Sequence, residues 1–321
     1  MRQVAPTLRC LILLLLSTQG HAVLGHPRQA GSSPPQPATE DAERAPGETP
    51  LPDIAALMRQ VETNQRTSET LQKSYLFHSV QTMQELGSGG EVKKTTSREA
   101  DHFWLNGVPV EKVTRRDGKD LSPAELAKED ERIDKETRKQ HQLREEKDAR
   151  GKETDPHGHD EVTVSRLLEL GAFTNERRVD RNGRATIAVD YTGDQHTSTH
   201  NRAEDVMKDL AGTVWIDEAD KVIVHLEGRF ARDFKIGGGV VADIHKDTHF
   251  AFDQARVNGE VWLPARIDAQ GQARALLLFK FAGRLNIAYS DYRKFRATAT
   301  VLPDVTPVET APAQREGATP P

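Results

Sequence analysis

The strongest constraint on the fold is a series of strand-length segments that follow one another from residue 213 to residue 292. They are rich in Val, Ile, Phe and Trp and are separated by turns that contain Gly, Asn or Asp, such as Asn258-Gly259. Extended segments joined by short turns of this kind are typical of antiparallel hairpins. The strands expected here are 213–217, 222–227, 230–236, 249–256, 261–267, 273–281 and 285–292, with a turn at 269–271.

A second group of predicted strands lies in the N-terminal half of the chain, at 75–84, 92–105 and 108–113. Another runs from Ala185 to Tyr191, where apolar residues alternate with polar ones as in a strand that is buried on one face. With ten or more strands and few helices, the fold class is predicted to be mainly β with α, and the sheet to be antiparallel, open and curved.

Four segments are predicted to be helical. In the first of them Ile54, Leu57, Met58 and Val61 recur at the spacing of one apolar helix face, and Asp53 precedes them as a cap. An open sheet of this size has a concave face that something must cover, and amphipathic helices can do so. The predicted helices are 54–61, 122–153, 164–168 and 202–210, of which the first and the third are the expected covers.

The helix expected over 122–153 differs from the others because almost all of its residues are charged or polar. Ser122-Pro123-Ala124-Glu125 opens it as a capping box with proline in the first helical position. One interpretation is an arm that binds a protein partner. The alternative is a solvated helix held by ion pairs four residues apart, such as Glu131 with Lys135.

The N-terminus has the pattern of a cleaved secretion signal. Arg2 and Arg9 form a positive region ahead of an apolar run that is too short to span a bilayer, and small residues mark a cleavage site after Ala22. Residues 1–22 are therefore predicted to be removed on export to the periplasm. Cleavage would also remove Cys10, the one cysteine of the chain, and with it any disulfide or thiolate chemistry.

Composition divides the rest of the chain into three parts. Residues 23–52 and 303–321 are rich in Pro, Gly, Ala and Ser or Thr and poor in large apolar side chains, so they are predicted to be a disordered linker and a disordered tail. Residues 53–302 remain as one domain with the charged helix 122–153 inserted in it. This domain has no apolar run of transmembrane length, and its charges of both signs are interspersed, which gives no reason to expect a nucleic-acid partner.

Several stretches of the sequence resemble the superfamily of periplasmic outer-membrane lipoprotein carriers, and more closely a set of exported relatives from soil bacteria such as acidobacteria. The resemblance covers about residues 53–302, and the chain differs from the best-known carriers in its greater length and its inserted charged helix. It implies an incompletely closed antiparallel β-barrel whose apolar, concave interior is lidded by helices and can hold acyl chains. The most similar stretches are GTVWID at 212–217, FKIGGG at 234–239, NGEVWLP at 258–264 and YSDYRKF at 289–295.

The function that this resemblance implies is that of a carrier for a lipid or for the acyl group of a lipoprotein, with no enzyme activity, cofactor or metal. Each buried methylene contributes roughly 0.8 kcal/mol, so burying an acyl chain needs no catalytic group. The alternative is an envelope interaction protein with a filled core that binds a partner through the charged helix. The candidates for the cavity wall, which could also be plain core residues, are Trp215, Phe230, Phe234, Phe252, Trp262, Phe279 and Phe281.

The spacing of polar residues indicates neither a catalytic site nor a metal site. His157 and His159 flank a glycine, but they lack a third ligand at a defined spacing, so surface histidines are favoured over a metal site. Ser79, Asp101 and His102 include the residue types of a catalytic triad without a spacing that demands one. A histidine-dependent metalloprotein or hydrolase is therefore disfavoured.

Overall fold

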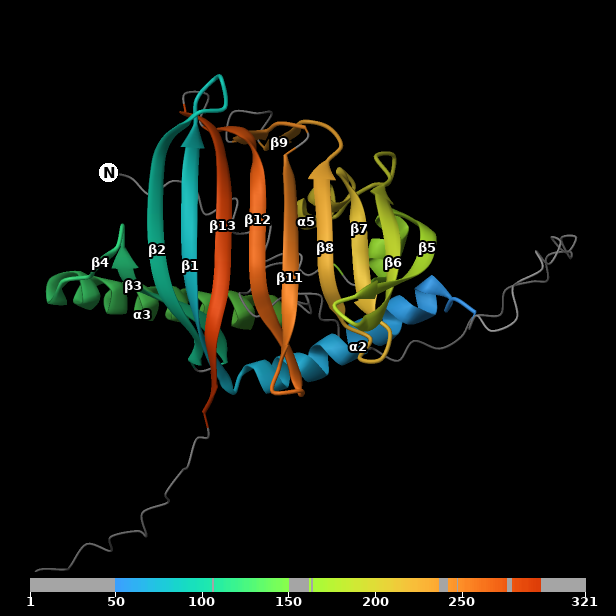
Figure 1. Ribbon diagram of the computed structural model, residues 1–321, viewed down its shortest axis with the longest axis horizontal. Coiled ribbons are helices and arrows are strands. Elements are labelled where there is room, and N and C mark those ends of the chain that lie inside the picture. Colours follow the sequence, from blue (N-terminus) through green and yellow to red (C-terminus); the bar gives the residue numbers. More distant parts are fainter. Residues whose placement is uncertain are drawn as a thin grey trace, which may run out of the picture.

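In the part of the chain that the computed structural model describes, thirteen strands form a single antiparallel sheet (Figure 1). The path through the sheet is β4-β3-β2-β1-β13-β12-β11-β8-β7-β6-β5, and the short β9 and β10 extend it beside β12. The two ends of this path do not pair with each other, so the sheet is open. The predicted fold class, an incompletely closed antiparallel barrel with helices, is therefore confirmed.

The structure describes residues 50–105, 107–149, 162, 164–236, 242–246, 248–275 and 279–295. The helices are α2 (Ile54–Gln72), α3 (Pro123–Asp148), α4 (Val164–Leu170) and α5 (Arg202–Met207). The strands are β1 (Tyr75–Leu86), β2 (Val92–Leu105), β3 (Val108–Arg116), β4 (Lys119–Asp120), β5 (Gly171–Arg181), β6 (Arg184–Gly193), β7 (Leu210–Asp217), β8 (Ile223–Phe230), β9 (Phe234–Ile236), β10 (Ala242–Ile244), β11 (His249–Val257), β12 (Val261–Ala275) and β13 (Phe279–Lys294).

Helices α2, α4 and α5 lie against one face of the sheet. The apolar face predicted for the first helix packs, together with α4, on Ile187 and Val189 of β6 and Ile216 of β7. Helix α5 packs beside them through Val206 and Met207. The two expected covers are thus confirmed as elements on one side of the sheet, and α2 continues well beyond its predicted end at residue 61.

Hairpin turns follow the local chemistry of the chain. At Asn258 and Gly259, between β11 and β12, both residues have positive φ, at 51° and 69°. A type I′ turn requires positive φ at both of its central residues, a conformation that Asn and Gly adopt at the least cost. The predicted turn at this position is therefore confirmed.

The predicted turn at 269–271 is wrong, because β12 runs through it from Val261 to Ala275. Gly271 lies directly opposite Gly283 of β13 in the ladder. A Cβ atom on Gly271 would lie 2.3 Å from side-chain atoms of Thr248, so this glycine permits a close approach and does not mark a turn.

Strand β5 was not predicted, although it pairs with β6 along most of its length. Its sequence is mostly polar because it lies at the end of the strand path, where a strand needs no continuous apolar pattern. The predicted signal peptide, the linker before residue 50 and the tail from 303 lie outside the described residues. Within the described part of the chain, none of the helices combines the length and the apolar character needed to cross a membrane.

Candidate functional site

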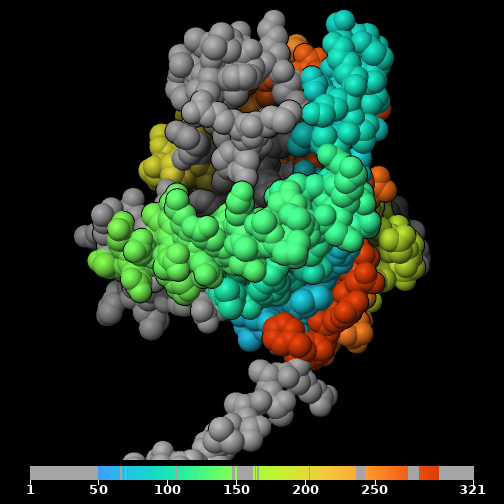
Figure 2. Space-filling model, turned by 90° about the vertical axis from the view of Figure 1, so that its left-hand side faces the viewer, coloured from blue at the N-terminus to red at the C-terminus, as the bar shows by residue number. Residues whose placement is uncertain are grey.

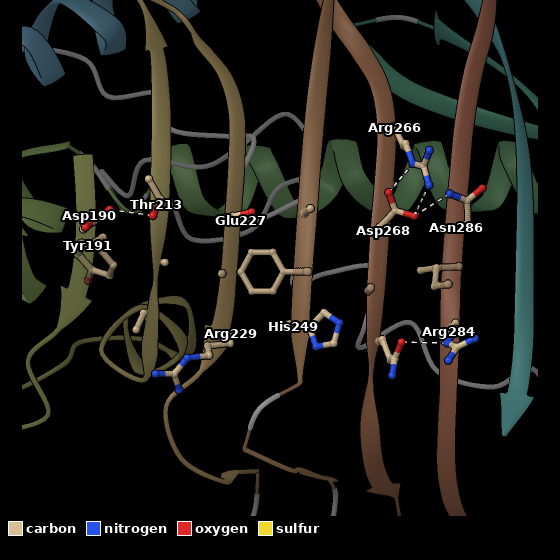
Figure 3. A pocket seen from close by; sticks show the side chains of 18 of the residues that line it. Asp190, Tyr191, Thr213, Glu227, Arg229, His249, Arg266, Asp268, Arg284 and Asn286 are labelled. Atoms are coloured by element: carbon tan, nitrogen blue, oxygen red, sulfur yellow. Dashed lines mark hydrogen bonds and ion pairs between the residues drawn. The ribbon is translucent and has the colours of Figure 1, made fainter. Parts of the chain in front are cut away.

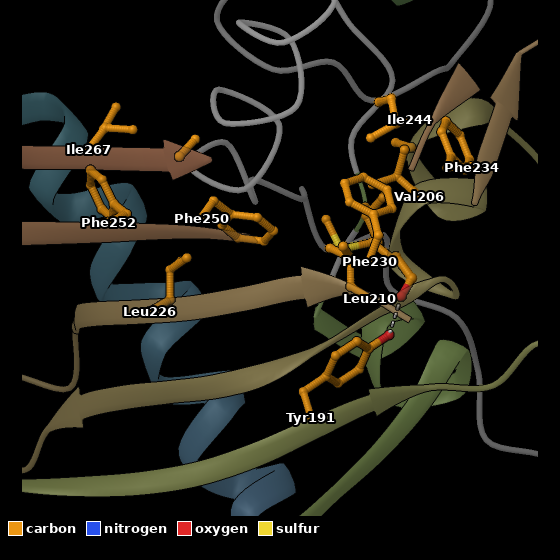
Figure 4. Close-up of a cluster of buried hydrophobic side chains, with 14 of the residues drawn as sticks. Tyr191, Val206, Leu210, Leu226, Phe230, Phe234, Ile244, Phe250, Phe252 and Ile267 are labelled. Atoms are coloured by element: carbon orange, nitrogen blue, oxygen red, sulfur yellow. Dashed lines mark hydrogen bonds between the residues drawn. The ribbon is translucent and has the colours of Figure 1, made fainter. Parts of the chain in front are cut away.

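The helix side of the sheet carries a large cluster of buried apolar side chains (Figure 4). Phe252 of β11 lies directly opposite Leu226 of β8 and Ile267 of β12, and Phe250 joins them two residues along the same strand. Because residues two apart in a strand share a face, these side chains form one continuous apolar surface. Val206 of α5 packs on the same cluster.

Three of the seven predicted cavity residues belong to this cluster. Phe230 is 0 % exposed, Phe252 2 % and Phe234 5 %. The ring centroids of Phe230 and Phe234 lie 5.8 Å apart. The structure thus brings these three residues together as a packed group, and their contact with a ligand stays a prediction.

The two predicted tryptophans lie on the other face of the sheet. Trp215 stands between Val214 and Ile216, both of which pack beneath the helices, and successive residues of a strand point to opposite faces. Trp215 packs beside Trp262 in a separate, small cluster. The Trp262 Nε1–H donates to Asp220 Oδ2 at 2.9 Å. Trp215 and Trp262 therefore do not join the phenylalanines.

The remaining two candidates, Phe279 and Phe281, lie at the start of β13. Their backbones pair with Ala275 and Ala273 of β12. Their side chains are not among those that the structure describes, so their predicted role is untested.

A strip of half-buried apolar side chains, which the sequence analysis missed, lies on the helix side of β1 and β13. Met83, Ile287 and Tyr289 pack against the edge of the buried cluster but keep part of their surface exposed. Phe77 extends the strip, with its ring centroid 5.8 Å from that of Tyr289. Of the described helices, α2 packs on β12 and α3 on β3, whereas β1 and β13 pack chiefly on neighbouring strands. The alternation of Leu285, Ile287 and Tyr289 was the available sequence signal.

Ser79 and His102 lie next to this strip and are hydrogen-bonded, with 2.8 Å between Ser79 Oγ and His102 Nε2. Asp101, the third residue considered for a triad, points to the opposite face of β2 from His102, where its carboxylate oxygen lies 2.9 Å from His78 Nδ1. The backbone of Ser79 is paired with Tyr289 on one side and with β2 on the other, so it offers no oxyanion-binding turn. These residues form a hydrogen-bonded pair and not a triad.

The face without helices carries a hollow of about 790 Å³ (Figure 3). Its lining side chains are mostly polar and come from seven strands, from β1 across to β6. Asp268 pairs with Arg266 and accepts a hydrogen bond from Asn286 Nδ2 at 2.8 Å. The hydrogen bonds from Arg266 and then Asn286 hold the pKa of Asp268 below its usual value. Thr213 donates to Asp190 Oδ1 at 2.8 Å on the far side of the hollow.

The charged helix α3 lies along the outer edge of β3, and Figure 2 shows it crossing this side of the molecule. Glu129 Oε1 accepts a hydrogen bond from the backbone N–H of Val113 at 2.9 Å. Arg132 donates to the carbonyl of Glu111 at 2.7 Å. An uncovered strand edge can pair with other chains, so side chains of α3 satisfy backbone groups that would otherwise be available.

Glu129 is the buried centre of this contact, with 4 % of its side chain exposed. Burial alone would raise the pKa of its carboxyl group. The hydrogen bonds from Arg132 and the Val113 N–H, together with the charge of Arg132, outweigh burial and lower the pKa below its usual value. Glu129 is therefore a charged, structural residue.

Metal binding has no support in the described part of the chain, where no three His, Cys, Asp or Glu residues form a group that could hold an ion. His157 and His159 lie outside the described residues.

Comparisons with known proteins give no family model and no curated protein that matches the chain. Among solved structures, it is similar to a domain described as an outer-membrane lipoprotein-sorting protein from Vibrio parahaemolyticus, at 9 % identity and a TM-score of 0.32, over 74 % of this chain and 93 % of the other. A DUF1329 family protein from Desulfovibrio piger matches at 9 % identity and a TM-score of 0.31, over 77 % and 95 %. The MucA/MucB complex of Pseudomonas aeruginosa matches at 10 % and 0.20, over 76 % and 99 %.

Proposed function

We propose that the protein binds an apolar chain, such as the acyl group of a lipid or lipoprotein, on the helix side of its sheet. The observation that carries this proposal is the half-buried strip of Phe77, Met83, Ile287 and Tyr289, which continues the buried cluster. Contiguous apolar surface that remains exposed marks an interaction site. Covering it contributes about 25 cal/mol for each Å² removed from water.

The proposed ligand lies along β1 and β13, with its far end toward Phe230, Phe234 and Phe252. These three phenylalanines are already buried, so they serve as the rigid end of the site and not as its open surface. Trp215 and Trp262 have no place in it because they lie on the other face.

The predicted signal peptide of residues 1–22 supports a periplasmic location for this activity, and the sequence resemblance to lipoprotein carriers supports the ligand class. Binding of this kind needs no catalytic group and no cofactor, because the free energy comes from the apolar surface that is removed from water.

Binding of a fluorescent fatty acid tests the proposal. Ile287→Asn and Met83→Asn each place a polar group in the strip, and we expect each to weaken binding about tenfold, which corresponds to about 1.4 kcal/mol. Val80→Asn is the matched control, because Val80 is 38 % exposed and alternates with the strip along β1. The proposal fails if the wild-type protein takes up no fatty acid and carries no acylated molecule in native mass spectra of the protein purified from its envelope fraction.

The alternative, a partner-binding arm, applies only to the outer surface of α3, because Glu129 and Arg132 are engaged with β3. Deleting the helix would expose the edge of β3, and a change in the pull-down could then come from the exposed edge and not from a lost partner surface. Reversing the exposed charges of Glu131, Asp134 and Lys135 leaves that edge covered, so loss of a partner in a pull-down with this variant would favour the alternative.

A further inference from the structure

The polar hollow and the apolar strip lie on opposite faces of the same strands. Asp268 stands between Ile267 and Ala269, which belong to the buried cluster, and Asn286 stands between Leu285 and Ile287. Alternation therefore directs the polar side chains away from the helices. Whatever occupies the hollow cannot be the apolar chain proposed above.

Small residues open the hollow at its centre. The backbones of Gly212 in β7 and Gly228 in β8, which lie directly opposite each other, form part of its floor. Ala211 and Ala251 add only methyl groups to the lining. Longer side chains surround this floor, as Figure 3 shows for Arg229, Arg266 and Arg284.

The charges of the hollow are balanced. Three arginines face three carboxylates, so no net field selects an anion or a cation. Several of these groups are held in place by each other. Arg266 and Asn286 both bind Asp268, and Arg284 donates to Gln270 at 2.9 Å. The hollow therefore presents donors and acceptors of fixed position side by side.

An aromatic ring stands at one end of this polar surface. Trp215 follows Thr213 on the same face of β7, about 7 Å further along the strand. Its ring is half-buried, packs against His225 with 4.6 Å between ring centroids, and lies beneath the guanidinium group of Arg181. Arg181 and His225 thus occupy this ring, which lies outside the lining and bounds the polar surface at that end, so the contacts that the hollow itself offers are hydrogen-bonding ones.

We propose that the hollow is a second binding site, for a neutral polyhydroxylated ligand of the oligosaccharide class. Each hydroxyl both donates and accepts, which matches the alternating donors and acceptors of this surface. A peptide added as an extra strand is disfavoured, because the strands that cross the hollow are already paired on both sides. This proposal rests on the hollow alone and does not depend on the apolar strip.

The site is tested by titrating the protein with chitotetraose, maltotetraose and cellotetraose. Binding is measured by calorimetry and by changes in the amide chemical shifts. We expect at least one sugar to bind, with shifts confined to the seven strands that line the hollow, and Asn286→Ala to weaken it about tenfold. Ser290→Ala is the matched control, because Ser290 lies on the same face of β13 and outside the lining. Both variants are checked for an unchanged melting temperature.

Absence of binding by all three sugars at millimolar concentration would overturn the proposal, as would equal binding by the two variants. The fluorescent fatty-acid assay on the same samples separates this outcome from failure of the proposed function. If both sites exist, a tetrasaccharide does not displace the fatty acid.

Discussion

Replacement of Glu129 by alanine tests whether α3 is a structural cover for the edge of β3. The change leaves the buried N–H of Val113 without its acceptor and removes two hydrogen bonds from Arg132, at 2.7 and 3.1 Å. Breaking a buried pair by removing one partner costs about 3–5 kcal/mol, and an unsatisfied buried N–H costs about 1–3 kcal/mol. Arg132 is 35 % exposed and keeps its bonds to Glu136 and to the Glu111 carbonyl, so its charge is not left buried and unpaired. We therefore expect the variant to lose about 2–3 kcal/mol of unfolding free energy, less than for a fully buried pair.

Urea unfolding followed by circular dichroism measures this loss. Glu131→Ala is the control, because Glu131 is exposed on the same helix, and we expect it to change the free energy of unfolding by less than about 0.5 kcal/mol. Size-exclusion chromatography should show association of the Glu129→Ala protein through the newly exposed strand edge. The interpretation of α3 is refuted if the Glu129 and Glu131 variants unfold at the same urea concentration and both remain monodisperse.

The lowered pKa of Glu129 gives the same contact a pH dependence of known sign. Because the folded state holds the proton less tightly than the unfolded chain does, this stabilisation is fully present above the unfolded pKa of about 4.5. It is lost as the pH falls through the lower, folded value. Glu129→Gln should therefore show a flatter loss of stability in acid than the wild-type protein.

Three further predictions concern other buried contacts. Asp217→Ala removes the partner of Arg184 from a site that is 1 % exposed, and we expect a loss of about 3–5 kcal/mol in urea unfolding, far above that of an exposed aspartate. Gly271→Ala should lower the melting temperature because the new Cβ clashes with Thr248. In a double-mutant cycle, Thr248→Gly should relieve that loss, whereas additive effects of the two changes would contradict the close approach. Burial raises the pKa of Tyr292 to about 12, so the alkaline absorbance titration of the wild-type protein should contain a late phenol that is missing from Tyr292→Phe.

Local signals in the sequence predicted many elements accurately. The strand 92–105 has its predicted bounds, the turn at Asn258-Gly259 lies where it was predicted, and the capping box at Ser122 opens α3 with Ser122 and Glu125 bonded to each other. These features depend on residues close together in the chain. A turn needs positive φ at two neighbours, and a cap needs an oxygen three residues from an N–H.

Only part of the predicted cavity wall lies on one face of the sheet, because the position of each residue along its strand decides which face its side chain takes. Trp215 and Phe252 both read as aromatic strand residues, yet they face opposite sides of the sheet, because a shift of one residue exchanges the faces of a strand. The side on which the helices pack then decided which aromatic residues joined the large buried cluster. The sequence contains the alternation but does not state which of the two faces will be covered.

By itself, the sequence determined the strand-rich class, the amphipathic helices and the charged character of α3, because each follows from periodicity or composition over a short window. Tertiary structure alone decided that β1 pairs with β13, that α3 covers the edge of β3, and that a polar hollow lies behind the apolar face. These features join residues far apart in the chain, up to about 220 positions for β1 and β13. Whether such distant residues pair depends on the balance between the entropy lost in closing long loops and the free energy gained by burying apolar surface across the whole sheet. No local sequence pattern contains that balance.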